Sequence, residues 1–394
     1  MFANSYLLKN SNQALISQVP GINTKIIVVI PSLREPDIRQ TLDSLLKCDL
    51  PEVEIEVIVL VNHSEDAEGK TKTFNHSTVQ NLKNWVQKNP LCGIRFYIVG
   101  PVELRKKWAG AGLARKKGMD EAVRRFNLLN KPEGVIVSLD ADTIVEPNYL
   151  IEIEAHFRQN PKQVGATLKF KHRTDGLEKK HVEGIRLYEA YLDYYKRSLT
   201  YAGYPYAMFT VGSAFAVRAE AYVRRGGMNR RQAGEDFYFL QNLAQIGIIG
   251  EIDTTTVHPS ARLSDRVPFG TGPILQRWMN GEEDLSKTYA FEAFRDLKEF
   301  FDRFSILYRI SDDDYEKLLK IIPTPVSEFL KIDNFKTELD DLNRNCASIT
   351  SFSDRFFQKF NAFKILKYLN AEHKNYYHKL DLTEQIGLLD DAVF

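Results

Sequence analysis

Apolar and polar positions alternate along the first half of the chain in a pattern typical of strands separated by helices. Four short, mostly β-branched apolar runs predict strands buried on both faces, and they span 26–30, 55–61, 94–99 and 135–139. Between these runs, apolar or small residues recur three or four positions apart, which predicts helices. The helical positions include Ile38, Leu42, Leu45, Val79, Leu82, Val86, Ala111, Ala114, Gly118 and Ala122. This alternation predicts an α/β fold with a largely parallel sheet flanked by helices.

The last part of the chain follows a different pattern, with few glycines and no strand-like alternation. Its large apolar residues recur at helical spacing in two stripes, which are Phe291, Phe294, Leu297, Phe301 and Phe304, then Phe352, Phe356, Phe360, Phe363 and Leu366. We therefore predict a helical C-terminal region over 286–394, after a domain over 25–285 and an N-terminal extension over 1–24. Exposed apolar stripes of this size are unfavourable, so we expect them to pack against the preceding domain or against a second copy of the chain in a homo-oligomer.

Composition and charge narrow the class of protein. The 394 residues carry a formal net charge of +1, which gives no overall attraction to nucleic acid or to an anionic membrane. Cys48, Cys92 and Cys346 lie far apart and lack metal-ligand spacing, so we expect reduced thiols. The start of the chain does not resemble a signal peptide, and no apolar run approaches the ~18 residues that span a bilayer. We expect a cytoplasmic protein without a transmembrane segment.

Two carboxylates follow the fourth predicted strand directly. Asp140 and Asp142 flank the small residue Ala141, at the carboxyl end of the run 135–139. Ligands of parallel sheets bind at the carboxyl ends of the strands. Two carboxylates at this place can converge on one hard divalent cation, which would stabilise the charge of a departing diphosphate. The same Asp-x-Asp pattern also occurs in turns that only cap helices.

The motifs of this chain resemble those of the family 2 glycosyltransferases, and they occur in the same order over roughly residues 25–278. The motifs are Val29-Ile30-Pro31-Ser32, Thr41-Leu42-Asp43-Ser44-Leu45, Gly112-Leu113-Ala114-Arg115 with Gly118, Asp140-Ala141-Asp142, Gly226-Gly227 and Glu235-Asp236. The resemblance implies a GT-A fold. It also implies an enzyme that moves a sugar from a nucleotide diphosphate-sugar to an acceptor hydroxyl with the help of Mn²⁺ or Mg²⁺.

The resemblance also implies which residues bind the donor. The residues expected to contact the nucleotide sugar are Pro31, Ser32, Glu35, Asn62, Arg115 and Asp140. The residues expected to bind the metal are Asp140, Asp142 and the later His258. At the end of the second strand, Asn62 replaces the acidic residue common in the family, and an amide both donates and accepts hydrogen bonds. The choice between uracil and guanine therefore stays open.

On the acceptor side, the resemblance implies that Asp236 is the general base of an inverting transfer and that Glu235 holds the acceptor. Arg277 and Trp278 match part of the Q-x-x-R-W motif of processive polysaccharide synthases, and Trp278 would stack on a sugar or pack in a core. Ile274 occupies the glutamine position of that motif, and the chain lacks the membrane helices of those synthases. We therefore expect Arg277 and Trp278 to bind the acceptor of a non-processive enzyme.

Arg262 and Arg266 lie near Gly270 and Gly272, a composition that favours a mobile loop closing on phosphates. Three other functions stay open: a retaining enzyme that makes an α-glycoside of a small acid such as glycerate, a non-catalytic scaffold that binds sugar nucleotides, and a nucleotidyltransferase. A dinucleotide-binding oxidoreductase is disfavoured, because Arg115 stands where its fingerprint needs a third glycine.

Overall fold

The computed structural model describes residues 1–10, 13–90, 93–230, 234–264 and 270–393. By its internal contacts the chain divides into two compact units. The first comprises Met1–Leu177 and Thr210–Gln276, and the second comprises Glu178–Phe209 and Arg277–Phe394. The boundaries expected at residues 24 and 285 stay predictions. Within the described residues, no helix combines the length and the apolar character needed to cross a bilayer.

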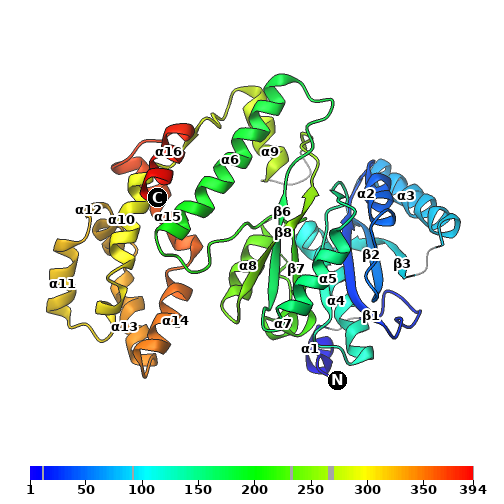
Figure 1. The fold of residues 1–394 in the computed structure, drawn as a ribbon, viewed down its shortest axis with the longest axis horizontal. Coiled ribbons are helices and arrows are strands. Elements are labelled where there is room, and N and C mark those ends of the chain that lie inside the picture. The colour runs from blue at the N-terminus through cyan, green and yellow to red at the C-terminus, as the bar shows by residue number, and fades with distance from the viewer. Residues whose placement is uncertain (11–12, 91–92, 231–233, 265–269, 394) are drawn as a thin grey trace. The chain divides into compact units, whose positions relative to one another are not determined.

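The first unit is built on a mixed sheet that contains eight strands within the described residues (Figure 1). Its strand order is β3-β2-β1-β4-β7-β6-β8-β5. The pairs β1–β2, β1–β4, β2–β3 and β6–β8 are parallel, whereas β7 is antiparallel to β4 and β6, and β5 is antiparallel to β8. The strands are β1 (Thr24–Ser32), β2 (Glu54–Ser64), β3 (Ile94–Leu104), β4 (Val135–Ser138), β5 (Ile144–Val145), β6 (Gly165–Phe170), β7 (Phe215–Arg218) and β8 (Ile249–His258).

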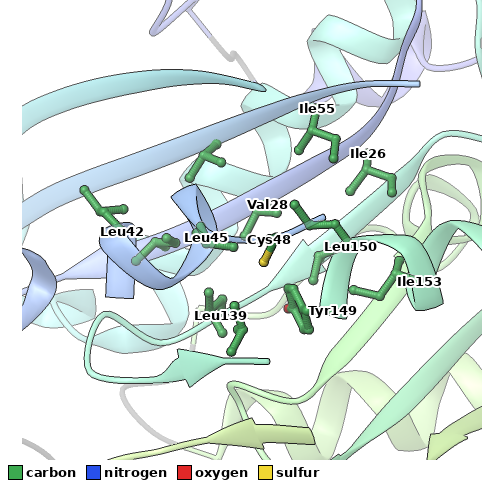
Figure 2. Close-up of a cluster of buried hydrophobic side chains, with 14 of the residues drawn as sticks. Ile26, Val28, Leu42, Leu45, Cys48, Ile55, Leu139, Tyr149, Leu150 and Ile153 are labelled. Atoms are coloured by element: carbon green, nitrogen blue, oxygen red, sulfur yellow. The ribbon is translucent and has the colours of Figure 1, made fainter. Parts of the chain in front are cut away.

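Helices cover both faces of this sheet, as the α/β prediction requires. They are α1 (Asn4–Lys9), α2 (Ile38–Leu46), α3 (Gly69–Lys88), α4 (Ala111–Leu129), α5 (Tyr149–Gln159), α7 (Ala219–Arg224) and α8 (Glu235–Ala244), with the 3₁₀ turn η1 (Lys106–Trp108); α9 (Thr271–Asn280) spans the boundary between the units. Val28 packs in one core cluster with Leu42 of α2 and Leu150 of α5 (Figure 2). The prediction of a mostly parallel sheet flanked by helices is confirmed.

Helix α4 lies against the opposite face of the sheet, where small residues allow a close approach. Successive side chains of a strand point to opposite faces, so Val29 faces away from the cluster around Val28. A Cβ atom added to Gly118 would come within 2.4 Å of Cγ1 of Val29. The glycine therefore lets α4 rest directly on β1, as the small residues of this segment predicted.

Strand β1 continues through Pro31, where the sequence pattern had placed its end. The carbonyl of Val29 accepts a hydrogen bond from the N–H of Leu139, so Val29 and Pro31 both face the β4 side of the strand. The pairing of β1 with β4 reaches only Val29. The missing N–H of Pro31 therefore costs the sheet no hydrogen bond, and the strand delivers Ser32 to the edge of the site.

The second unit is helical. Its helices are α6 (Lys179–Tyr201), α10 (Phe291–Phe301), α11 (Asp312–Ile321), α12 (Thr324–Ile332), α13 (Phe335–Asn345), α14 (Ile349–Lys359), α15 (Ala362–Asn375) and α16 (Leu382–Val393), with the turn η2 (Phe304–Leu307) and a short antiparallel pair of β9 (Lys287–Thr288) and β10 (Leu380–Asp381). The two phenylalanine stripes cover each other: the rings of Phe301 and Phe356 lie 6.3 Å apart, and both are buried. These residues are therefore buried without a second copy of the chain.

Candidate active site

The carboxyl ends of β1, β2 and β4 meet at one edge of the sheet, because the three strands are parallel neighbours. The side-chain amide of Asn62 in β2 donates a hydrogen bond of 3.0 Å to the carbonyl of Ser32 in β1. Asn75 of α3 in turn donates to the carbonyl of Asn62 at 2.8 Å. The buried hydroxyl of Ser32 has no hydrogen-bond partner among the described residues. An unsatisfied buried hydroxyl is costly, so this edge can gain free energy from a polar ligand.

A buried arginine joins two acidic segments that are distant in the sequence. Arg115, in the first turns of α4, contacts Oδ1 of Asp140 at 2.5 Å through Nη2, and it contacts Glu235 through Nη1. Only 4% of its side chain is exposed. Asp140 follows β4 and Glu235 begins α8, so Arg115 fixes the end of the sheet relative to the start of that helix. Arg115 thereby connects the expected donor residues to the expected acceptor residues.

Glu235 and Asp236 occupy the first turn of α8, the position that the sequence predicted for them. Burial, followed by the charge of Glu235, raises the pKa of Asp236 well above its ordinary value. The carboxylate of Asp236 accepts a hydrogen bond of 2.8 Å from the N–H of Phe237. Glu235 is buried and paired with Arg115. Burial raises the pKa of Glu235 as well, but the charge of Arg115 opposes this rise and Glu235 is tied up in the ion pair.

A second arginine lies on the other carboxylates of the site. The guanidinium of Arg262 contacts both carboxylate oxygens of Glu35, at 2.6 Å through Nη1 and more closely through Nη2. It also contacts Oδ2 of Asp142 at 3.2 Å and Oδ2 of Asp37 at 3.5 Å. Burial, followed by the charges of Asp140 and Glu35, raises the pKa of Asp142 to about 7. These three carboxyl groups and Arg262 thus form one charged cluster.

The carboxylate oxygens of Asp140 and Asp142 are suitable ligands for a hard divalent cation. Asp140 and Asp142 offer oxygen ligands, which Mg²⁺ and Mn²⁺ prefer, and the charges of Asp140 and Glu35 add to burial in raising the pKa of Asp142. Among the described residues, no group of three or more acidic, histidine or cysteine side chains is arranged as a complete metal site. A cation here would therefore need further oxygen ligands from water or from a diphosphate.

His258 lies at the end of β8, where its imidazole contacts Glu146 instead of the expected aspartates. Nε2 lies 3.3 Å from Oε1 of Glu146, and Nδ1 lies 3.1 Å from the carbonyl oxygen of Lys171. The antiparallel pairing of His258 with Ile144 nevertheless keeps the histidine close in the fold to the segment that carries Asp142. Its role as a metal ligand stays a prediction.

Arg277 and Trp278 belong to the second unit. The indole N–H of Trp278 donates to the carbonyl of Lys180 at 2.8 Å, and a Cβ atom added to Gly184 would come within 2.4 Å of the indole ring. Nε of Arg277 lies 3.6 Å from Glu283. Trp278 is thus packed against α6, and its contact with an acceptor stays a prediction.

Sequence reasoning missed some residues that shape the site. A Cβ atom added to Gly212 would lie 2.8 Å from Nη2 of Arg115, so this glycine makes room for the guanidinium. Asn75 is buried and supports Asn62, although in the sequence it stands among polar residues of α3 that give no sign of this role. Arg262, expected to contact phosphates, contacts carboxylates in the structure. Arg266, from the same predicted loop, lies outside the described residues, as does Cys92.

Residues 135–307 match the family model described as glycosyl transferase family group 2. This segment includes Asp140, Asp142, Glu235 and Asp236. The match confirms the resemblance to the family 2 glycosyltransferases and indicates a glycosyltransferase enzyme. No curated protein matches the chain.

Several solved structures are similar to the chain at low sequence identity. A crystal structure of S. aureus TarS 1-349 in complex with UDP-GlcNAc is 14% identical with a TM-score of 0.44, and the match covers 85% of this chain and 92% of that one. The mannosyltransferase PcManGT from Pyrobaculum calidifontis, in complex with GDP-Man and Mn²⁺, is 12% identical with a TM-score of 0.39 and coverages of 100% and 93%.

A longer S. aureus TarS structure is 14% identical with a TM-score of 0.39, and the match covers 75% of this chain and 47% of that one. The present chain thus spans about half the length of that relative. At these identities and TM-scores, the grounds for assigning a function are the family match and the side chains of the site.

Proposed function

We propose that this relative of the family 2 glycosyltransferases transfers a sugar from a nucleotide diphosphate-sugar to an acceptor hydroxyl and inverts the anomeric centre. The observation that carries the proposal is the meeting of two acidic segments at one buried arginine. Arg115 contacts Asp140, which belongs to the expected donor side, and Glu235, which belongs to the expected acceptor side. A transfer between two bound sugars needs these two sides within one site, because proximity and orientation lower the barrier.

On the donor side, Asp142 and Asp140 would hold the divalent cation. When bound, the cation supplies positive charge that stabilises the departing nucleotide diphosphate. The unpartnered hydroxyl of Ser32 and the amide of Asn62 lie at the neighbouring strand ends and would bind the nucleotide. Because the NH₂ group of Asn62 already donates to the backbone of Ser32, its oxygen is the atom best suited to accept from the base. Uracil and guanine both offer such an N–H group.

On the acceptor side, Asp236 would remove the proton of the attacking hydroxyl. The acceptor oxygen then bonds to the anomeric carbon as the bond from that carbon to the diphosphate oxygen breaks, and the diphosphate leaves with the electron pair. A carboxylate with a raised pKa is a stronger base than an ordinary one, and burial beside Glu235 gives Asp236 that property. Glu235 is held by Arg115 and would orient the acceptor.

The substitution Asp236→Asn tests this mechanism, because it keeps the shape of the side chain and removes its basicity. We expect kcat to fall by about 10²–10⁴-fold, the usual contribution of a positioned base. The affinity for UDP or GDP with Mn²⁺ should stay unchanged in calorimetry. Asp253→Asn, an exposed aspartate of β8, is the matched control and should keep wild-type turnover.

The anomeric configuration of the product, read by NMR, separates the remaining alternatives. An inverted product is expected from a single displacement with one base. A product that keeps the donor's configuration, together with an active Asp236→Asn variant, would instead establish the retaining enzyme. A wild-type protein that binds a sugar nucleotide and neither transfers nor hydrolyses its sugar with any acceptor would be a scaffold.

A further inference from the structure

Arg262 pairs with Glu35 and Asp142, two carboxylates that the proposed function assigns to the binding of the donor and its cation. Its guanidinium bridges Glu35, which follows β1, and Asp142, which follows β4, and it approaches Asp37 at the start of α2. These contacts join segments 120 and 227 residues from Arg262 in the sequence. A monovalent side-chain cation thus lies against Oδ2 of Asp142, one of the oxygen atoms expected to bind a divalent cation.

Arg262 is more exposed than Arg125 and Arg115, two deeply buried arginines that form ion pairs in this unit. The side chain of Arg125 is 0% exposed in its pair with Glu56, and that of Arg115 is 4% exposed. Arg262 is 24% exposed, and its partner Asp142 is 22% exposed. Because Arg262 lies at the rim of the site, its guanidinium can leave the partly exposed Asp142 and still pair with Glu35, whose side chain is only 3% exposed, so no buried charge is stranded. The contact of Arg262 with Asp142 is therefore the exchangeable one of the cluster.

We propose that Arg262 is an internal counter-cation: it neutralises Asp142 and Glu35 in the free protein and competes with the divalent cation for Asp142. The inference rests on the proposed donor site. A divalent cation on Asp142 displaces the guanidinium by occupying the same oxygen and by repelling its charge. A guanidinium released in this way is suited to bind the diphosphate, because its planar fork matches phosphate oxygens.

This exchange has a thermodynamic consequence. In the free protein, the cation must compete with Arg262, so its affinity is reduced. A nucleotide diphosphate offers Arg262 a new partner, and it thereby raises the affinity for the cation. By linkage the cation raises the affinity for the nucleotide by the same factor. The protein should therefore bind cation and nucleotide together and bind the cation alone weakly.

The test is a titration of the full-length protein with Mn²⁺ alone, followed by electron paramagnetic resonance, and a second titration in the presence of UDP or GDP. Arg262→Gln should bind Mn²⁺ alone about fivefold or more tightly than the wild type, which is the lower range of typical coupling factors. The gain in Mn²⁺ affinity on adding the nucleotide should shrink in this variant. Arg262→Lys keeps the charge but loses the bidentate fork, so its Mn²⁺ affinity should lie between the two.

Two control variants separate competition from a general change in charge. The guanidinium of Arg173 donates at 2.8 Å to the backbone carbonyl of Asp142 and not to its carboxylate. Arg173→Gln removes one positive charge at the same place, and it should raise Mn²⁺ affinity less than Arg262→Gln does. Combining Arg262→Gln with Asp142→Asn should return Mn²⁺ binding to the weak level, because the contested carboxylate is gone.

The outcomes distinguish this inference from the proposed function. If Arg262→Gln binds Mn²⁺ alone no more tightly than the wild type, while Asp142→Asn abolishes Mn²⁺-dependent nucleotide binding, the counter-cation role is wrong and the donor site stands. If Asp142→Asn binds Mn²⁺ and nucleotide like the wild type, the donor site itself is wrong. Arg262→Gln could fail to fold, which circular dichroism would show. Arg262→Lys then tests the inference in its place, and an unchanged Mn²⁺ affinity in that variant would overturn it.

Discussion

The buried arginine at the centre of the site, Arg115, offers a quantitative test of how the site is held together. Arg115→Met keeps most of the side-chain volume and removes the guanidinium. Glu235, 4% exposed, would then be a buried charge without its partner, whereas Asp140, 37% exposed, remains in contact with water. Breaking a buried ion pair by removing one partner typically costs about 3–5 kcal/mol. We expect the free energy of unfolding to fall by about 3 kcal/mol or more, mainly through Glu235.

Urea unfolding followed by circular dichroism measures this loss. The matched control is Arg158→Met: that arginine contacts Glu154 at 3.1 Å, but 64% of its side chain is exposed. A surface pair of this kind contributes less than about 1 kcal/mol. Adding Glu235→Gln to Arg115→Met should recover much of the stability, because a neutral amide does not need a charged partner. A loss no larger than that of the control, or no recovery in the double variant, would refute this account of Arg115.

Three further predictions follow from individual contacts. Gly212→Ala should weaken binding of UDP or GDP with Mn²⁺ and lower stability by about 1–3 kcal/mol, because its Cβ would lie 2.8 Å from the Arg115 guanidinium; unaltered binding and unfolding would show that the guanidinium shifts freely. Asn62→Ala should weaken nucleotide binding by about 1–3 kcal/mol in calorimetry, and unchanged affinity would place Asn62 outside the base pocket. In the second unit, burial followed by the charge of Asp296 raises the pKa of Glu372 to about 7. The folded chain therefore holds this proton more tightly than the unfolded chain, so the stabilisation is present below about pH 4 and is lost as the pH rises through about 7. Glu372→Gln should flatten the fall in unfolding free energy over this range, and a pH profile identical to that of the wild type would contradict the assignment.

The core of the first unit was predictable because its strands and helices are specified by apolar patterns within short segments of the sequence. The run 26–30 is apolar at every position, and it forms the buried part of β1. Leu42 and Leu45 recur at helical spacing and pack beneath the sheet in α2. Strand ends were less predictable: the sequence pattern does not show that Pro31 faces a side of β1 where pairing has already ended.

Long-range contacts between charged side chains are the part of the site that could not be predicted. The resemblance to the family indicated Asp140, Asp142 and Asp236 as site residues, and their roles remain predictions. Nothing in the sequence pairs Arg262 with Glu35, 227 residues away, because an arginine in a polar segment is equally compatible with solvent, phosphate or carboxylate. The need for glycine at position 212 has no local signal either, because the side chain that needs the space, Arg115, comes from another segment.

The adjacent carboxylates Glu235 and Asp236 show how one buried cation can divide roles between neighbours. Consecutive residues of a helix project about 100° apart, so a guanidinium that contacts Glu235 directly does not contact the next side chain in the same way. Arg115 pairs with Glu235, whose negative charge then helps to raise the pKa of Asp236. Burial is the largest cause of the raised pKa of Asp236, and the charge of Arg115 opposes it, so the role of Arg115 is to hold Glu235 in place. This arrangement explains in physical terms why we assign the base to Asp236, and it predicts that Arg115→Met changes the pH dependence of turnover as well as stability.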